Sequence, residues 1–178
     1  VDPPKGTGLD LHELYEEYLN LSNFIAGEGI REKSVHTWME ERRKAKDYFK
    51  GKFSPENIDD LTKEEFDSFF YFKNNRAWTM LYRRKRPLLE NFDESKRNIV
   101  HRQDESISIP KRLNDVMQGG IYWVNGFGKN ITTGILHTCD EKDQYGVWNN
   151  RTEDTLRLLD RSPRIHYKDH GLSYTKVN

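Results

Sequence analysis

The sequence lacks several features that would assign a protein class directly. It contains one cysteine, Cys139, so no disulfide can form within the chain and a reducing compartment is expected. No apolar run approaches the roughly 20 residues of a membrane-spanning helix, so no membrane partner is expected. The formal net charge is zero, with 29 basic and 29 acidic residues, so overall charge does not indicate a nucleic-acid partner. We expect a cytoplasmic protein, nucleoid-associated in a prokaryote, whose binding depends on local patterns.

Motifs for metal, cofactor and nucleophilic chemistry are also missing. His137 and Cys139 form a closely spaced pair, but no second pair completes a zinc site. No nucleophile elbow with serine, histidine and aspartate is present, and no glycine-rich phosphate loop of the nucleotidase kind. We therefore expect no metal and no cofactor.

Helical patterns account for most of the sequence. The four Trp, nine Tyr and nine Phe residues are enough to fill a core, although mean hydropathy is −0.97. Apolar residues recur at spacings of three and four, as in amphipathic helices, and strand patterns are weak. We predict an all-α, multi-helix domain over 9–162, preceded by a flexible tail (1–8) and followed by a polar C-terminal tail (163–178).

Local signals predict where the helices begin and end. Gly51 is expected to close a helix that begins near Lys33, and Ser54-Pro55 to begin the next one. Thr62 and Glu65 have the spacing of a capping box. Further helices are predicted over 9–25, 93–103, 110–118 and 129–138, and near the C-terminus after a cap formed by Asn150 with Glu153.

Positive charge is concentrated in the middle of the chain. The range 76–112 holds ten basic residues against five acidic ones. Within it, Arg83, Arg84, Lys85 and Arg86 form an unbroken run that ends at a proline. This run is expected either to bind phosphates or to be a solvated charge cluster at a helix end, where cations suit the helix dipole.

The most informative segment joins two glycines to a predicted helix. We call Gly126, Phe127, Gly128 and Lys129 the glycine segment. Its glycines allow a tight hairpin, Phe127 is expected to anchor it in the core, and the following helix start can offer N–H groups to a phosphate. Lys129, Asn130 and Thr132 are then candidate nucleic-acid contacts. A helical corner that uses glycine for tight packing is the alternative interpretation.

The glycine segment and its flanks resemble the helix-hairpin-helix element, in particular the version found in the DNA glycosylase superfamily. The resemblance covers about residues 111–160. It includes Ile135-Leu136, the charged loop 140–144, the apolar turn 145–148 and the segment Asn149-Asn150-Arg151. Residues 143–151 and the helix around FDSFFYFKNNRAWTML are also similar to helical proteins associated with restriction systems. The resemblance implies an all-helical fold that binds duplex DNA in repair or defence.

The expected catalytic groups of that superfamily are absent from this sequence. Where its members have a lysine after the glycine segment, this chain has Asn130, and where they have an aspartate it has Asn149. An amide cannot act as a carboxylate base, so the resemblance implies binding without catalysis. Asn149, Asp140 and Asp143 remain weak catalytic candidates.

The remaining candidate contacts lie on either side of these positions. One of Asn149 and Asn150 is expected to cap the last helix, and an amide there can otherwise hydrogen-bond a base edge. Arg151 is a candidate backbone contact. Tyr122 and Trp123, just before the glycine segment, can stack on a base if they are not core residues.

Three functions follow from these patterns. The first is a non-enzymatic domain that binds double-stranded DNA and senses a modified or flipped base, with a nuclease or motor supplied by a partner chain. The second is an active DNA glycosylase of unusual chemistry. The third is a protein–protein interaction module in which the glycine segment is only a corner.

Overall fold

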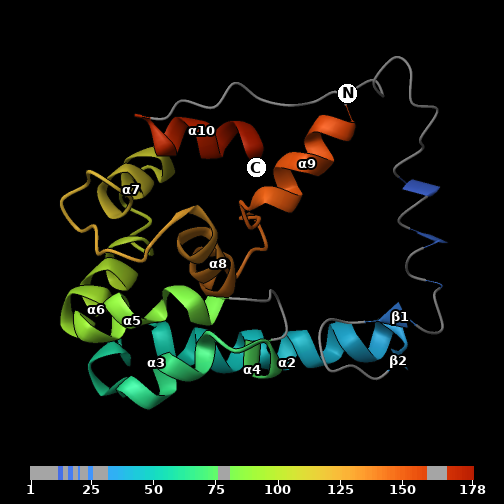
Figure 1. Cartoon of the computed structure of the whole chain (residues 1–178), viewed down its shortest axis with the longest axis horizontal. Helices are drawn as coiled ribbons and strands as arrows, with labels where there is room; N and C mark the ends of the chain where they lie inside the picture. Colours follow the sequence, from blue (N-terminus) through green and yellow to red (C-terminus); the bar gives the residue numbers. More distant parts are fainter. Residues whose placement is uncertain are drawn as a thin grey trace.

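The described part of the chain is helical apart from one short strand pair (Figure 1). The computed structural model describes residues 12–13, 16–17, 20, 24–25, 32–75, 81–159 and 168–178. The predicted tail over 1–8 and most of the helix predicted over 9–25 lie outside these residues. Strand β1 (Phe24–Ile25) pairs antiparallel with β2 (Glu32–Lys33). The prediction of an all-α, multi-helix domain is confirmed.

The helices follow each other at short intervals. In chain order they are α2 (Val35–Phe53), η1 (Ile58–Asp60), α3 (Lys63–Phe69), α4 (Phe72–Asn75), η2 (Leu81–Arg84), α5 (Lys85–Glu90), α6 (Phe92–His101), α7 (Ile109–Val116), α8 (Lys129–Cys139), α9 (Asn150–Leu158) and α10 (His170–Val177). The predicted helices over 93–103, 110–118 and 129–138 correspond to α6, α7 and α8.

Capping signals were reliable where the capping bond is local. Thr62 accepts from the backbone N–H of Glu65, whose side chain accepts from the backbone of Thr62, so the predicted capping box at α3 is confirmed. Two other boundary predictions were wrong. Gly51 lies inside α2, which continues to Phe53, and Ser54 caps the C-terminus of α2 instead of beginning a helix. Packing of Phe53 in the core outweighs the low helix propensity of glycine.

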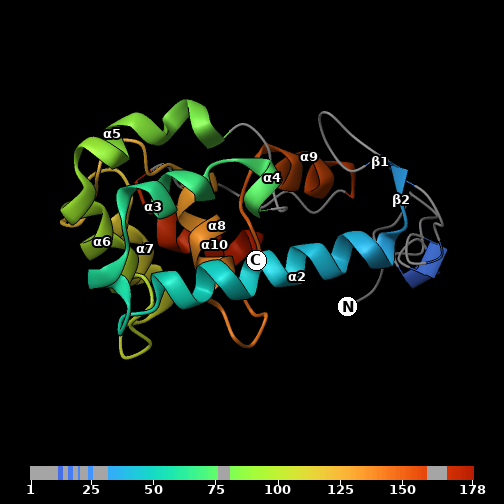
Figure 2. The same ribbon diagram turned by 90° about the horizontal axis from the view of Figure 1, so that it is seen from below.

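Most of the core is aromatic and lies between α2, α3, α5, α6 and α8. Its buried members are Phe49, Phe53, Ile58, Leu61, Phe66, Phe69, Phe70, Leu88, Ile99, Val124, Phe127, Ile131 and Ile135. Several phenylalanine rings meet edge to face, including Phe49 with Phe69 at 5.1 Å between centroids. Each such ring contributes about 1.5–3 kcal/mol through burial. This cluster fixes α2 against α8 (Figure 2).

A second, smaller cluster attaches α7 and α10 to the other side of α8. It contains Leu113, Val116, Met117, Leu136, Trp148 and Tyr174. Within the predicted polar C-terminal tail, residues His170–Val177 form α10. A Cβ on Gly171 would lie 2.0 Å from the carbonyl oxygen of Pro110, so only glycine permits this close approach of α10 to α7. Helix α8 is therefore the central element between two cores.

Candidate nucleic-acid interface

Gly126 places the glycine segment against the basic stretch η2–α5. Its φ is +106°, in the region that favours glycine. A Cβ there would lie 2.9 Å from both the carbonyl oxygen of Arg84 and Cγ of Leu88. The chain turns at this point, because the N–H of Phe127 donates to the carbonyl of Val124 at 3.1 Å. Tertiary packing thus joins the two basic features that the sequence analysis treated separately.

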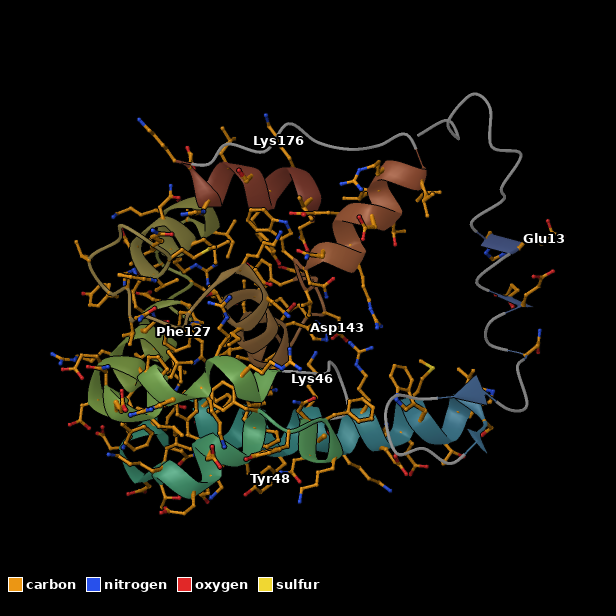
Figure 3. All side chains as sticks on the ribbon, viewed as in Figure 1. Glu13, Lys46, Tyr48, Phe127, Asp143 and Lys176 are labelled. Carbon is orange, nitrogen blue, oxygen red and sulfur yellow. The ribbon has the colours of Figure 1, made fainter. Side chains whose placement is uncertain are left out.

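A buried arginine supports the glycine segment from inside. Phe127 is 2% exposed, as predicted for an anchor (Figure 3). The guanidinium of Arg102 lies 4.6 Å from the Phe127 ring centroid. Arg102 donates to the carbonyls of Thr132 at 3.0 Å and Asn98 at 3.3 Å. Burial lowers the pKa of Arg102 to about 9, so it stays charged at neutral pH. These bonds connect α6 to the first turns of α8 and hold the segment rigidly.

The start of α8 is open to a ligand. Gly128 is the N-cap residue, and no side chain caps the first N–H groups of this 11-residue helix. A Cβ on Gly128 would meet nothing within 4 Å, so the space beside the N-cap residue is free. Unpaired N–H groups and the helix dipole together favour an anion there.

The run Arg83–Arg86 divides into two halves. Lys85 is held by the carboxylate of Asp67 and the hydroxyl of Tyr71, each at 2.5 Å. Arg86 pairs with Glu90 at 2.7 Å. Arg83 and Arg84 are exposed, and neither forms an ion pair within the described residues. These two arginines are therefore the members of the run that are exposed and have no acid partner in the described part of the chain.

Lys129 is engaged by an acid that the sequence analysis assigned to capping. Its ammonium lies 2.6 Å from Oε1 of Glu153, and the same oxygen accepts from the indole N–H of Trp148 at 2.7 Å. Partial burial raises the pKa of Glu153, but hydrogen bonds from Lys129 and Trp148 outweigh this effect and hold it below its usual range. The ion pair brings the first turn of α9 beside the first turn of α8.

The predicted contacts around the first turns of α8 and α9 have different environments. Thr132 is fully buried, so its side chain is not available to a ligand, contrary to the prediction. Asn130 is half-buried. Asn149 accepts from the N–H of Thr152 at 3.0 Å and is the cap of α9, whereas Asn150 and Arg151 are exposed. The capping role predicted for one of the two asparagines is confirmed for Asn149. The predicted cap formed by Asn150 with Glu153 is wrong, because Asn150 is the first residue of α9 and Glu153 binds Lys129 and Trp148.

The two aromatic candidates lie on a well-anchored loop before the glycine segment. Tyr122 stacks on His101 with 4.3 Å between centroids, which occupies one of its faces. The carbonyl of Tyr122 accepts from Asn98 at 2.7 Å, and its N–H donates to Asp115 at 2.8 Å. Trp123 is 40% exposed, and the preceding Ile121 is 79% exposed. Trp123 is the better placed of the two predicted rings for stacking on a ligand.

The weak catalytic candidates Asp140 and Asp143 lie at the opposite end of α8. Asp140 accepts the N–H groups of Lys142 at 3.0 Å and Tyr145 at 2.7 Å, so it organises the loop. Asp143 pairs with Lys46 of α2 (Figure 3). Helix α8 has 11 residues, which places this loop about 16 Å from the glycine segment along the helix axis. Neither acid reaches the open start of α8.

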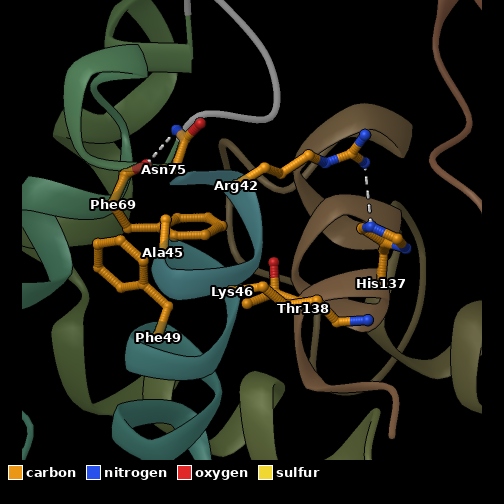
Figure 4. Close-up of a pocket in the computed structure, with 8 residues that line it drawn as sticks. All are labelled: Arg42, Ala45, Lys46, Phe49, Phe69, Asn75, His137 and Thr138. Carbon is orange, nitrogen blue, oxygen red and sulfur yellow. Dashed lines mark hydrogen bonds between the residues drawn. The ribbon is translucent and has the colours of Figure 1, made fainter. Parts of the chain in front are cut away.

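A small pocket lies at that same end, between α2 and α8 (Figure 4). His137 projects from α8; its Nδ1–H donates to the carbonyl of Tyr145 at 2.8 Å, which leaves Nε2 to accept from Arg42 at 3.2 Å. Burial lowers the pKa of His137, and the nearby charges of Arg42 and Lys46 act in the same direction. The imidazole is therefore a neutral structural group at pH 7.

Within the described ranges, no three His, Cys, Asp or Glu side chains gather as a metal site requires. Burial raises the pKa of the Cys139 thiol to about 12, so the thiolate, which is the form that binds metals, is scarce at neutral pH. None of the helices in the described part of the chain is both long and apolar enough to span a bilayer.

Sequence reasoning missed two residues that shape this surface. Arg102 is the buried C-cap residue of α6, at a position where helical periodicity predicts an apolar side chain. Glu153 meets Lys129 across 24 positions of sequence, and no local spacing predicts that contact. No protein-family model, curated protein or solved structure matches the chain. The site must therefore be interpreted from its own geometry.

Proposed function

We propose that this chain binds nucleic acid, in the first place double-stranded DNA, without catalysing a reaction on it. The contact is a cationic surface formed by Arg83, Arg84, Gly128, Lys129 and Arg151. The observation that supports the proposal is the close approach of Gly126 to the Arg84 backbone. The segment that carries Arg83 and Arg84, which form no ion pair within the described residues, therefore packs against the chain just before the uncapped start of α8. Phosphates are the anions that such N–H groups and guanidinium groups bind together.

The proposed surface extends from α5 across the start of α8 to α9. In the view of Figure 2, helices α5 and α9 both lie on the side away from α2, and Figure 1 shows them on either side of α8. Arg84 is the residue before α5, and Arg151 is in the first turn of α9. A chain with no net charge can bind a polyanion in this way when acids offset part of its positive charge elsewhere, as they do at Lys46 and Lys50 of α2.

Two further elements of the proposal concern recognition and context. Trp123 offers an exposed ring beside the cationic surface, where it would stack on an unpaired, modified or flipped base. A relation to the helix-hairpin-helix glycosylases and a role beside a nuclease or motor in repair or restriction are consistent with this binding mode. The distance of Asp140 and Asp143 from the start of α8 favours binding over glycosylase activity.

The test is DNA binding across a salt series. We expect wild-type affinity for a short duplex to fall steeply with salt, and Arg83→Ala/Arg84→Ala to lower the slope of log K against log salt by about two. The matched control is Arg43→Ala/Lys44→Ala, which removes two exposed cations from α2 on the opposite side. Equal losses in both variants, or no wild-type binding at low salt, would refute the proposed surface.

One observation favours the protein–protein alternative. Ile121 and Trp123 are both exposed, two positions apart on an anchored loop, and such apolar residues are common in protein interfaces. Under this alternative, substitution of Ile121 would abolish capture of a partner chain, and the arginine variants would not.

A further inference from the structure

The cationic surface contains one acid that works against its proposed ligand. Glu153 receives hydrogen bonds from both Lys129 and Trp148, at 2.6 Å and 2.7 Å. The Lys129 ammonium also lies 5.5 Å from the Trp148 ring centroid, so three side chains form one cluster. The ion pair is neither deep nor fully solvated, because the side chains of Lys129 and Glu153 are 32% and 25% exposed. A phosphate approaching the start of α8 can therefore reach both.

We propose that Glu153 is a built-in competitor for phosphate that occupies Lys129 until a nucleic-acid backbone displaces it. This inference rests on the proposed function and adds a selectivity to it. Like a phosphate, the carboxylate is an anion that accepts hydrogen bonds from a cation beside a helix start. It differs in being attached to the chain, so it competes at a high effective concentration.

Competition of this kind discriminates between single anions and polyanions. When a free phosphate displaces Glu153, a new ion pair with Lys129 forms but the Lys129–Glu153 ion pair is broken. The net free energy of binding is therefore small. A nucleic-acid backbone places neighbouring phosphates on Arg83, Arg84 and Arg151 at the same time, and these contacts offset the lost pair. The cluster therefore favours continuous phosphodiester chains over inorganic phosphate.

Trp148 keeps the carboxylate of Glu153 in position beside Lys129. Its indole N–H has no other hydrogen-bond acceptor in the described structure and holds Oε1 of Glu153 in place. A glutamine at position 153 keeps an oxygen that can accept from Trp148 but removes the charge that holds Lys129. Glu153→Gln is thus a conservative variant that separates the competing charge from the structural hydrogen bond.

The experiment compares Glu153→Gln with Asp154→Asn, because Asp154 is the next residue of α9 and pairs with Arg157, not with Lys129. We expect Glu153→Gln to bind a short duplex about five- to tenfold more tightly than wild type and to increase the salt slope by about one. Asp154→Asn should change the affinity less than about twofold, as expected for an exposed ion pair. Lys129→Met combined with Glu153→Gln should abolish the gain.

The outcomes separate this inference from the proposed function. Wild-type binding with no gain in Glu153→Gln, or equal gains in Glu153→Gln and Asp154→Asn, overturns the inference and leaves the proposed function standing. If only Glu153→Gln binds the duplex and the wild type does not, Glu153 blocks the phosphate site completely, which supports the inference. No binding by either protein overturns both. Tight binding of inorganic phosphate by the wild type contradicts the selectivity, and circular dichroism verifies that each variant is folded.

Discussion

The two ends of helix α8 carry similar numbers of charged groups but use them differently. At the C-terminal end, Lys46 pairs with Asp143, Lys50 with Glu141 and Lys142 with Glu105. At the N-terminal end, Arg83, Arg84 and Arg151 are exposed and form no ion pair within the described residues. Exposed ion pairs contribute only about 0–1 kcal/mol to stability. Their clearer effect is to offset the positive charge of the cations that they hold, so the C-terminal end of α8 offers less positive charge to a polyanion than the N-terminal end does.

The two ends also differ in what forms them. At the C-terminal end, side chains form the surface: Asp140, Asp143 and His137 hold a loop against α2. At the N-terminal end, backbone groups are part of the surface, because Gly126 and Gly128 have no side chains to cover the helix start. A surface of backbone N–H groups depends on a precise chain path, and this dependence gives the first test of the comparison.

Gly126→Val should have the largest effect. A branched side chain at φ +106° is strained and would meet the Arg84 carbonyl and Leu88, so we expect a loss of about 3 kcal/mol in unfolding free energy and loss of DNA binding. Gly128→Ala is the control, with an expected cost below about 1 kcal/mol, because its Cβ meets open space. Urea denaturation measures both. Equal stability of Gly126→Val and Gly128→Ala would show that the close contact is not needed.

Trp123→Ala should have an intermediate effect, limited to binding. Removal of an exposed stacking ring is expected to weaken binding to a duplex with one unpaired base by about 1–2 kcal/mol. Continuous duplex should be affected less, since its bases are already stacked. Trp123→Phe retains a ring and should recover most of the affinity in a fluorescence-anisotropy titration. Equal losses on both DNAs would indicate a general contact and not base stacking.

The smallest effect concerns pH and lies at the C-terminal end. Because burial lowers the pKa of His137 below 6.5 in the folded state, the unfolded chain takes up this proton first as the pH falls. The histidine therefore makes stability decrease as the pH drops from about 7 through 6.5, and DNA binding is not involved. His137→Gln should flatten the pH dependence of the urea midpoint, whereas the exposed His36→Gln should leave it unchanged. An identical pH profile in all three proteins would contradict the burial of a neutral imidazole.

Much of the fold near the site was predictable because its signals are local. The bounds of α8 followed from the glycines before it, and the cap of α3 from the spacing of Thr62 and Glu65. Predictions failed where distant packing decided the outcome. Gly51 stays helical because Phe53 belongs to the core, and α10 is ordered by its contact with α7 although its sequence is polar.

The sequence by itself determined the helical class, the position of the glycine segment and the capacity of its glycines for an open helix start. Only the tertiary structure decided which charges are available. It paired Lys129 with Glu153, tied Lys85 to Asp67 and left Arg83 and Arg84 free beside Gly126. Backbone conformation depends on neighbours a few residues away, and sequence spacing reveals it. Charge pairing depends on which helix surfaces meet in the folded chain, and residues far apart in sequence settle it.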